Sequence, residues 1–319
     1  MRALAELAAN SKVVERDVIV GTSPAHNILR RQDSAVGDGS TYKAPGDKDS
    51  DACSKDKCCI WSYIAADMAG AFTDGDQCSN LARGAIRLGF HDAAAWNSSL
   101  PSGGADGSIL LSGELSRPEN RGLEPIAART SAWFETYKPY GISMADLIQF
   151  GANVATVACP QGPRIRTFIG RADSTEQPPT GLLPGAQQEA PALLQLFGAK
   201  TFSPAELVAL MGAHSVSRQR FANPRQPGAP QDSTPGVMDT NYYAETSAQR
   251  PPAGVVRFPS DVSLARDAAT SATWQSFTGA ANQAPWAAAY AQAYFKMSML
   301  GVKNVGDLTD CTAVLPLPR

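Results

Sequence analysis

Two of the three histidines in this 319-residue chain lie in segments whose residue types could do chemistry. His91 ends the run RLGFHD and follows Arg87 by four residues, so the two side chains share one helix face, one turn apart. A neutral imidazole beside a fixed guanidinium can take a proton from a bound hydroperoxide while the guanidinium stabilises charge on the leaving oxygen. Taken alone, this segment is more often explained by an arginine and a histidine that share a helix face by chance and have no catalytic role.

His214 ends a second such segment, residues 206–215. Leu207, Leu210 and Met211 share its face of a predicted helix, so the imidazole emerges from an apolar stripe near the helix end. An imidazole in that position can coordinate a haem iron, although a core histidine bonded to a carbonyl is the commoner case. The remaining histidine, His26, lies in a polar N-terminal region, and we expect no role for it.

Oxygen-rich residues follow each of these two histidines. Ca²⁺ prefers six to eight hard oxygens from carboxylates, hydroxyls and carbonyls. A single Asp, Ser, Thr and Gly cluster usually only turns the chain. Two clusters, each beginning beside one histidine, suggest ion sites that fix the helix positions. The first set is Asp92, Gly104, Asp106 and Ser108, and the second is Ser215 with residues 232–239.

The elements that must position these residues are predicted to be mainly α-helical, because Ala- and Leu-rich segments are many and β-branched runs are few. Ser203-Pro204-Ala205-Glu206 is a capping-box start for the helix before His214. Residues 160–190 and 216–260 are rich in loop-forming residues. Helices are predicted over 58–72, 79–95 and 143–158, from 203 to His214, and as a pair between 271 and 300 separated near Pro285.

Composition excludes several classes of function. The net charge is −2, which gives no electrostatic reason to expect nucleic acid or an anionic membrane as a partner. No run of 18 apolar residues predicts a transmembrane helix. A chain of this length can bury a large core, in one domain or in two halves around a cleft.

The six cysteines include the adjacent pair Cys58-Cys59 and no CxxC spacing, which favours a disulfide framework over a zinc site. Six cysteines allow 15 pairings, and the residues alone do not choose among them. Disulfides indicate an oxidising compartment and hence secretion, as does the glycosylation sequon at Asn97. Six free thiols in a cytosolic protein is the alternative.

We expect residues 1–52 to be a leader or tail outside the fold. Met1 to Asn27 has no clean apolar core of a signal peptide, and residues 28–52 are polar and predicted to be disordered. The dibasic pair Arg30-Arg31 is a candidate processing site. The folded domain would then span 53–319, in two halves over about 53–160 and about 161–319.

The combined motifs from Cys53 to Cys311 resemble those of the fungal secretory (class II) haem peroxidases of the plant-type superfamily. They are RLGFHD, GGADGS, GELSRPEN, GAHSVS, DSTPGVMD and RFPSD. The resemblance implies about ten helices in two halves that enclose haem b, with little β structure. It also implies a monomer that oxidises small phenols or aromatics with hydrogen peroxide, one electron at a time at the haem edge, through a high-valent iron-oxo intermediate.

The resemblance also implies residue roles. His91 would be the distal acid–base with Arg87 as its partner, Phe90 would pack over the haem, and Asn120, supported by Glu114, would accept a hydrogen bond from His91. His214 would be the axial iron ligand, with its other N–H bonded to Asp261. Two Ca²⁺ ions would be held by Asp92, Gly104, Asp106 and Ser108, and by Ser215, Asp232, Thr234, Val237 and Asp239. The implied disulfides are Cys53–Cys59, Cys58–Cys311 and Cys78–Cys159.

Several positions depart from the family pattern. Manganese-oxidising members carry acids where this chain has Asn80, Gly84 and Arg220, so Mn²⁺ would lack its carboxylates. Members with a catalytic surface tryptophan carry it where this chain has Ala209. We therefore expect a generic peroxidase with neither route.

Other positions leave questions open. Gln231 replaces a phenylalanine on the proximal side, and Ala272 stands where a fourth disulfide would have a cysteine. Residues 177–182 are candidates for the opening to the haem. Trp96 and Trp133 are candidate electron relays, although packing is the commoner use of such residues. Two rival interpretations are an intracellular peroxidase of the cytochrome c or ascorbate type and a secreted calcium-binding protein that has lost haem.

Overall fold

The computed structural model describes residues 35–319, which form a mainly α-helical structure, as predicted. Two short antiparallel pairs, β1 (Thr73–Asp74) with β2 (Gln77–Cys78) and β3 (Phe168–Ile169) with β4 (Thr309–Asp310), are the strands of this part. The helices are α3 (Asp51–Ser54), α4 (Cys59–Phe72), α5 (Asn80–Ala93), α6 (Ser108–Leu111), α7 (Glu124–Tyr137), α8 (Met144–Ala158), α9 (Ala190–Ala199), α10 (Pro204–Met211), α11 (Asn241–Ser247), α12 (Pro259–Arg266), α13 (Ser271–Ser276) and α14 (Gln283–Met297).

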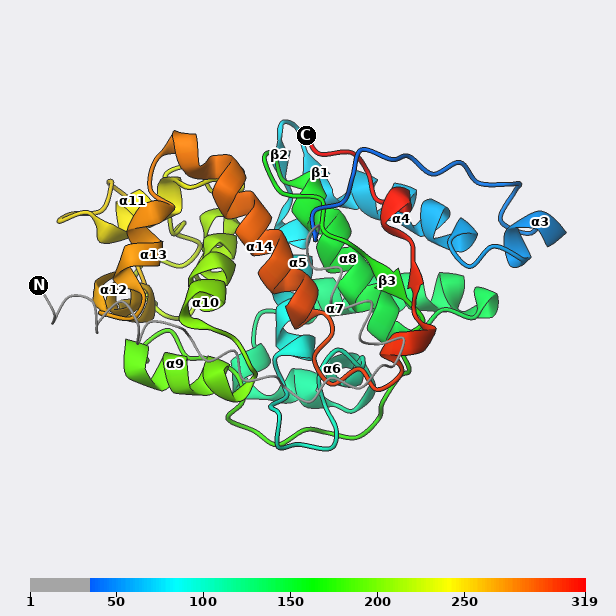
Figure 1. The fold of residues 1–319 in the computed structure, drawn as a ribbon, viewed down its shortest axis with the longest axis horizontal. Helices are drawn as coiled ribbons and strands as arrows, with labels where there is room; N and C mark the ends of the chain where they lie inside the picture. The colour runs from blue at the N-terminus through cyan, green and yellow to red at the C-terminus, as the bar shows by residue number, and fades with distance from the viewer. Residues whose placement is uncertain (1–34) are drawn as a thin grey trace, which may run out of the picture.

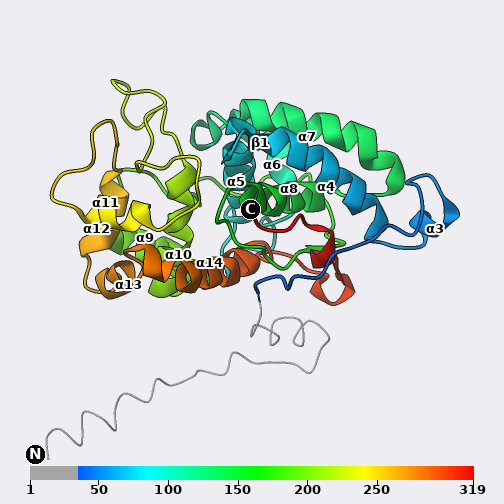
Figure 2. The ribbon, with the colours of Figure 1, turned by 90° about the horizontal axis from the view of Figure 1, so that it is seen from above.

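The helices fall into two groups. Helices α3 to α8 gather on one side of the molecule and α9 to α13 on the other, while α14 runs between them (Figures 1 and 2). Helix α5 packs on α4, α7 and α8, whereas α10 packs on α9, α13 and α14. His91 therefore belongs to one group and His214, just after α10, to the other. This arrangement is consistent with the expected distal and proximal halves.

Local sequence signals explain where the site-bearing helices begin. The Ser79 hydroxyl accepts a hydrogen bond from the Ala82 N–H at the start of α5. Ser203 and Glu206 form the complete predicted capping box at the start of α10, with Pro204 in the first turn. Such an N-cap contributes about 1 kcal/mol. The pair predicted over 271–300 divides at residues 277–282, slightly before Pro285.

The chain around His214 is a 3₁₀ turn, Gly212–Val216, rather than the predicted last turn of an α-helix. Gly212 lets the Trp286 indole pack directly on this turn, because a Cβ there would be only 2.3 Å from the ring. The indole N–H of Trp286 donates to the Ala209 carbonyl at 3.1 Å. Helix α14 thus anchors the turn that carries His214.

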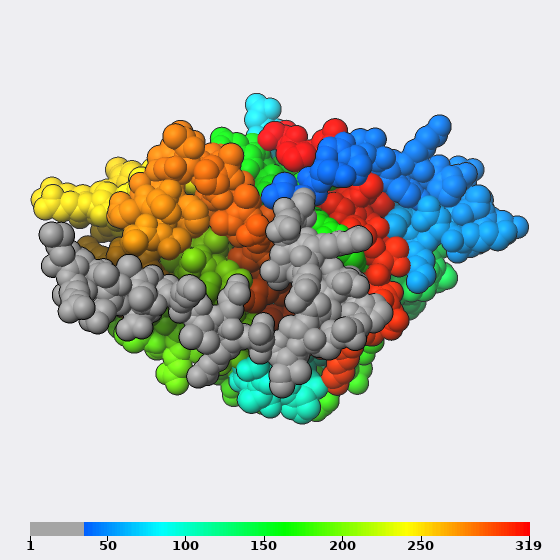
Figure 3. All heavy atoms as spheres, viewed as in Figure 1, coloured from blue at the N-terminus to red at the C-terminus, as the bar shows by residue number. Residues whose placement is uncertain are grey.

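The expected disorder of residues 28–52 is wrong for residues 35–52, which pack on the domain; residues 28–34 lie outside the described part. The Arg164 side chain is 1% exposed, and its guanidinium donates to the carbonyls of Asp38, Ser40, Ala313 and Leu315. Residues 35–52 therefore lie beside the C-terminal segment (Figure 3). Composition missed this because the partners are distant in sequence, so the fold begins by residue 35 rather than 53.

Three disulfides include all six cysteines: two lie within the stretch of chain from α3 to the end of α8, and one ties the start of α4 to the C-terminal segment. Their pairs are the ones that the resemblance implied. They are Cys53–Cys59, Cys58–Cys311 and Cys78–Cys159. The second and third close long stretches of chain, which limits the conformations of the unfolded state.

Candidate active site

His91 is held in one orientation by Asn120. The His91 Nδ1 lies 2.8 Å from the Asn120 Oδ1, and the Asn120 amide nitrogen donates to the Glu114 main-chain carbonyl at 2.8 Å. The second bond fixes which end of the amide faces the imidazole, so Nδ1 carries the proton and donates it. The Nε2 of His91 is left as the basic nitrogen.

Arg87 lies one turn before His91 on α5, as predicted. Its Nε donates to the His91 Nε2 at 3.1 Å. Its two terminal nitrogens donate to the main-chain carbonyls of Arg121, at 2.9 Å, and Glu119, at 3.0 Å. Neutral carbonyls therefore anchor the guanidinium. None of these three contacts is with a carboxylate, so they leave its positive charge unpaired.

These surroundings keep His91 neutral. Burial, with a smaller contribution from the positive charge of Arg87, lowers the pKa of His91 to about 3, although the bond to Asn120 opposes the shift. An imidazole with this pKa is unprotonated at neutral pH and can accept a proton. Together, Arg87 and His91 provide a base and a fixed positive charge within one turn of helix.

Glu114 and Phe90, two neighbours of this pair, make contacts that the sequence did not specify. Glu114 supports Asn120 through its main-chain carbonyl, while its carboxylate accepts from Arg117 at 3.3 Å and Ser112 at 3.1 Å. Sequence reasoning could not distinguish the carbonyl from the carboxylate. The ring of Phe90 is half-buried and stacks on Phe197 of α9, with 6.3 Å between ring centroids.

His214 is held by Asp261, which is the predicted pair. Its Nδ1 lies 3.0 Å from the Oδ2 of Asp261, a carboxylate that is fully buried at the start of α12. Because the carboxylate accepts, Nδ1 carries the proton and Nε2 has a free lone pair. The imidazole also lies edge-on to Tyr242 and Phe258.

Apolar surface lies open beside each of the two histidines. The His214 side chain is 31% exposed although its partner Asp261 is fully buried, so another edge of the ring is open. Phe90 and Ala213, the chain neighbours of the histidines, are apolar and also partly exposed. A flat apolar cofactor such as haem would cover these surfaces, and the free Nε2 of His214 could bind its metal.

The contacts that join the two groups of helices lie around these histidines. Arg83, one turn before Arg87, donates twice to the Pro235 carbonyl, and the buried Lys200 donates to the Trp96 carbonyl at 2.7 Å. The Phe221 ring packs so closely on Gly122 that a Cβ there would lie 2.9 Å from it, and Gly122 has a φ of +89°. These contacts fix the spacing of the two halves.

Of the residues predicted to hold a proximal cation, those in 232–239 contact one another, and two members of the set have buried oxygens without partners. The Asp232 Oδ2 and the Ser215 hydroxyl have no hydrogen-bond partner, and both residues are fully buried. The Thr234 hydroxyl donates to the Asp239 carboxylate at 2.9 Å. Burial and the nearby Asp239 carboxylate raise the pKa of Asp232 to about 8. A cation here would satisfy these oxygens.

The distal set also surrounds buried carboxylates. Asp92 is 1% exposed and accepts from the N–H groups of Gly107, at 3.2 Å, and Ile109, at 3.5 Å. Burial, together with the neighbouring Asp106 carboxylate, raises the pKa of Asp92. Gly104 has a φ of +104°, and a Cβ there would lie 2.2 Å from the Leu300 carbonyl oxygen, so only glycine fits this turn.

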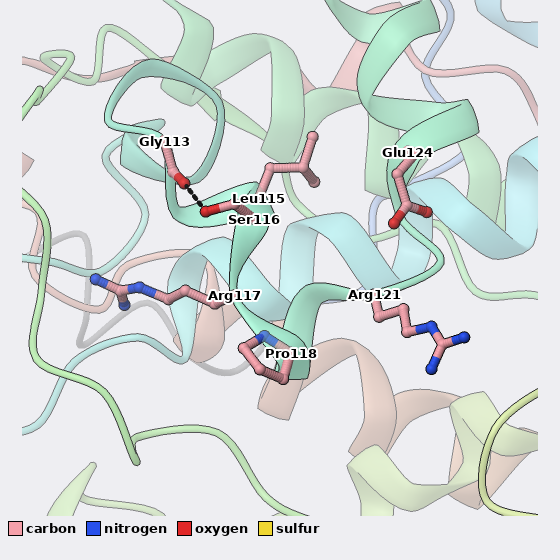
Figure 4. A pocket seen from close by; sticks show the side chains of 7 residues that line it. All are labelled: Gly113, Leu115, Ser116, Arg117, Pro118, Arg121 and Glu124. Carbon is pink, nitrogen blue, oxygen red and sulfur yellow. Dashed lines mark hydrogen bonds between the residues drawn. The ribbon is translucent and has the colours of Figure 1, made fainter.

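An open pocket of about 510 Å³ lies along the segment that holds Arg87. Arg117 and Arg121 point away from each other on either side of Pro118 (Figure 4). The Arg121 guanidinium lies over the Phe221 ring, 4.1 Å from its centroid. Arg117 also donates to the Pro178 carbonyl at 2.7 Å, so the predicted opening segment, residues 177–182, begins beside this pocket. The other lining residues are Gly113, Leu115, Ser116 and Glu124.

At the positions where manganese-oxidising or surface-tryptophan members carry their special residues, this chain has side chains with other contacts. Asn80 accepts from Arg83 at 3.0 Å, and Gly84 packs against Ile126. Ala209 is buried, so it is not a surface position. Trp133 is buried edge-on to Phe72, in keeping with a packing role.

Within residues 35–319, no helix has both the length and the apolar character needed to span a bilayer. His26 lies outside the described residues.

Comparison with known proteins gives one consistent result. A family model described as "Peroxidase" matches residues 64–280. The chain is 32% identical to a versatile peroxidase of Pleurotus eryngii over 99% of this chain and 87% of the relative. It is 35% identical to a peroxidase of Arthromyces ramosus over 88% of this chain and 81% of the relative, and 32% identical to a ligninase of Phanerodontia chrysosporium over 82% and 75%. With the geometry above, these matches show that the chain belongs to the peroxidase family, among the fungal class II haem peroxidases, and is an oxidoreductase that acts on peroxide.

Proposed function

We propose that this chain uses hydrogen peroxide to oxidise small phenolic or aromatic donors by one-electron steps at the edge of a haem b. The observation that carries the proposal is the matched pair of imidazoles. His91 and His214 each donate through Nδ1 to a fixed oxygen, of Asn120 and Asp261 respectively, and each therefore keeps a basic Nε2. Bound haem would supply the redox-active iron, which the Nε2 of His214 would hold.

The distal residues would carry out the proton transfer. The Nε2 of His91 would accept a proton from one oxygen of hydrogen peroxide and return it to the other, the leaving oxygen, while the bound haem would supply the two electrons that O–O cleavage needs. Arg87 stabilises the negative charge on that leaving oxygen. Asn120 keeps the Nδ1 proton in place, so His91 acts only through Nε2.

We assign the donor to the pocket beside Pro118. Its volume, about 510 Å³, lies in the range of small-molecule sites, and Leu115 and Pro118 offer apolar surface for an aromatic ring. The main chain that lines the pocket also binds Arg87, through the carbonyls of Glu119 and Arg121. Donors would thus bind next to the distal side. With Asn80, Gly84 and Arg220 replacing carboxylates, Mn²⁺ oxidation is not expected.

We further propose two Ca²⁺ ions that brace the histidine-bearing segments. Asp92 directly follows His91, and Ser215 directly follows His214. The unpartnered oxygens of Asp232 and Ser215 support the proximal site, and the buried carboxylate of Asp92 supports the distal one. The remaining proposed ligands are Gly104, Asp106 and Ser108 at the distal site, and Thr234, Val237 and Asp239 at the proximal site.

Secretion, glycosylation at Asn97 and a monomeric state complete the proposal. The three disulfides support an oxidising compartment. A leader upstream of residue 35 stays a prediction, since that stretch lies outside the described residues.

The decisive test is a steady-state screen of the haem-loaded protein with hydrogen peroxide and three donors: a small phenol, a non-phenolic aromatic and Mn²⁺. We expect saturable oxidation of the phenol and negligible Mn²⁺ turnover. No peroxide-dependent oxidation of the phenol would overturn the proposed donor class, and saturable Mn²⁺ oxidation at low concentration would show that a manganese site had been missed.

A further inference from the structure

Gln231 lies directly in the hydrogen-bond network of the proximal histidine. The residue is 1% exposed, and its Nε2 lies 3.0 Å from the Asp261 Oδ2, the same oxygen that accepts from the His214 Nδ1. The Gln231 Nε2 is also 3.5 Å from the His214 Nδ1. One carboxylate oxygen is therefore shared by an imidazole and an amide.

The orientation of this amide is set from its other end. The Ser217 hydroxyl donates to the Gln231 Oε1. In the flipped orientation, Oε1 would face the Asp261 carboxylate, and two acceptors would oppose each other in a buried place. Gln231 must therefore donate to Asp261. The other oxygen of that carboxylate, Oδ1, accepts from the Ser260 hydroxyl at 3.0 Å.

A second donor on Oδ2 changes what the carboxylate can offer to the imidazole. On Oδ2 the negative charge of Asp261 is shared between the His214 and Gln231 hydrogens, while Ser260 bonds to Oδ1, so less charge draws the Nδ1 proton away from His214. The imidazole keeps more neutral character, and its Nε2 donates less electron density to a metal bound there. Hydrogen bonding around a metal ligand shifts the metal's reduction potential in this way.

We propose that Gln231 is a positioning residue that raises the iron reduction potential by competing with His214 for Asp261. The proposal rests on the proposed role of His214 as the iron ligand. A phenylalanine, the residue that the family pattern predicts here, has no donor to offer this carboxylate, so Gln231 would distinguish this chain from relatives that carry one.

The test compares two variants in the same loop, each of which replaces a buried glutamine with methionine. Gln231→Met keeps the length of the side chain and removes its donor. Gln219→Met is the control, because Gln219 is also buried but bonds to the main chain at Asn223 and Gln226, away from Asp261. The readouts are the Fe(III)/Fe(II) potential and the iron–histidine stretching band of the ferrous protein.

We expect Gln231→Met to favour the ferric form about three- to tenfold, where tenfold corresponds to about 59 mV for a one-electron couple. The iron–histidine band should move to higher frequency, and Gln219→Met should change neither readout. Ser217→Ala removes the hydroxyl that orients the Gln231 amide and changes no fully buried side chain. It should shift the potential and the iron–histidine band in the same direction as Gln231→Met but to a smaller extent. This variant replaces Gln231→Met as the test if Gln231→Met does not fold.

An unchanged potential in Gln231→Met and Ser217→Ala, with the iron–histidine band present, would overturn the role of Gln231 while leaving the His214 assignment intact. Absence of an iron–histidine band in the unmodified protein would instead overturn the proposed ligand. A shift in the opposite direction would also refute the competition.

Discussion

Replacing His91 with alanine tests the proposed proton transfer. Asn120 and Arg87 hold the imidazole at both nitrogens, so its loss removes a positioned base and leaves the guanidinium without its Nε partner. A positioned acid–base group contributes about 10²–10⁴-fold to a rate. At 1.36 kcal/mol per tenfold, the barrier to the reaction with peroxide should therefore rise by about 2.7–5.4 kcal/mol.

The assay is stopped-flow mixing of the haem-loaded protein with excess hydrogen peroxide, followed at the haem absorbance band. Haem content should stay normal in His91→Ala because His214 is untouched. Gln149→Leu is the matched control: the Gln149 amide donates to the Gly89 carbonyl at 3.0 Å, so this change disturbs the packing of α5 on α8 without contacting His91. A peroxide rate constant in His91→Ala within threefold of the unmodified protein would refute the reasoning.

Four further results are expected. Because the lowered pKa of about 3 keeps His91 neutral, the peroxide rate constant should stay flat from pH 8 to pH 5 and fall only as protonation begins near pH 3; a midpoint near 6.5 would contradict the buried geometry. Leu115→Trp should fill the pocket and raise the KM for a small phenol severalfold with the peroxide rate constant unchanged, and equal KM values would move the donor elsewhere. Removal of Ca²⁺ by a chelator at fixed pH should lower the Tm. Adding Ca²⁺ back at 100 times its Kd should stabilise the folded state by about 2.7 kcal/mol, and Asp232→Asn should reduce this gain. Arg164→Met leaves buried carbonyls without a donor, so we expect the free energy of unfolding to fall by roughly 3 kcal/mol and the Tm in calorimetry by roughly 6–12 °C. An unchanged Tm would show that this side chain does not hold residues 35–52 to the C-terminal segment.

Local patterns in the sequence predicted the helices that position the site. The Ser203 capping box and the Ser79 cap start α10 and α5 close to where the pattern places them. The four-residue spacing of Arg87 and His91 also predicted their contact, since residues one turn apart on a helix are neighbours. These features depend on residues close together in the chain, which is why they could be inferred without a structure.

Contacts between distant residues could not be inferred from composition. Residues 35–52 look disordered by their polarity, yet Arg164 and the C-terminal segment bind them through main-chain carbonyls, which carry no sequence signal. The pairing of His214 with Asp261, 47 residues apart, followed only from the resemblance to the peroxidases. Gln231 was noted as unusual, but its bond to Asp261 depends on a loop path that the sequence does not specify.

The most direct test of the central claim is the haem content and the ferrous iron–histidine band of three proteins: unmodified, His91→Ala and His214→Ala. The account predicts an intense haem absorbance and an iron–histidine band in the first two, and loss of the band, with weakened haem retention, in His214→Ala alone. A His214→Ala protein with full haem content and an unchanged iron–histidine band would contradict it.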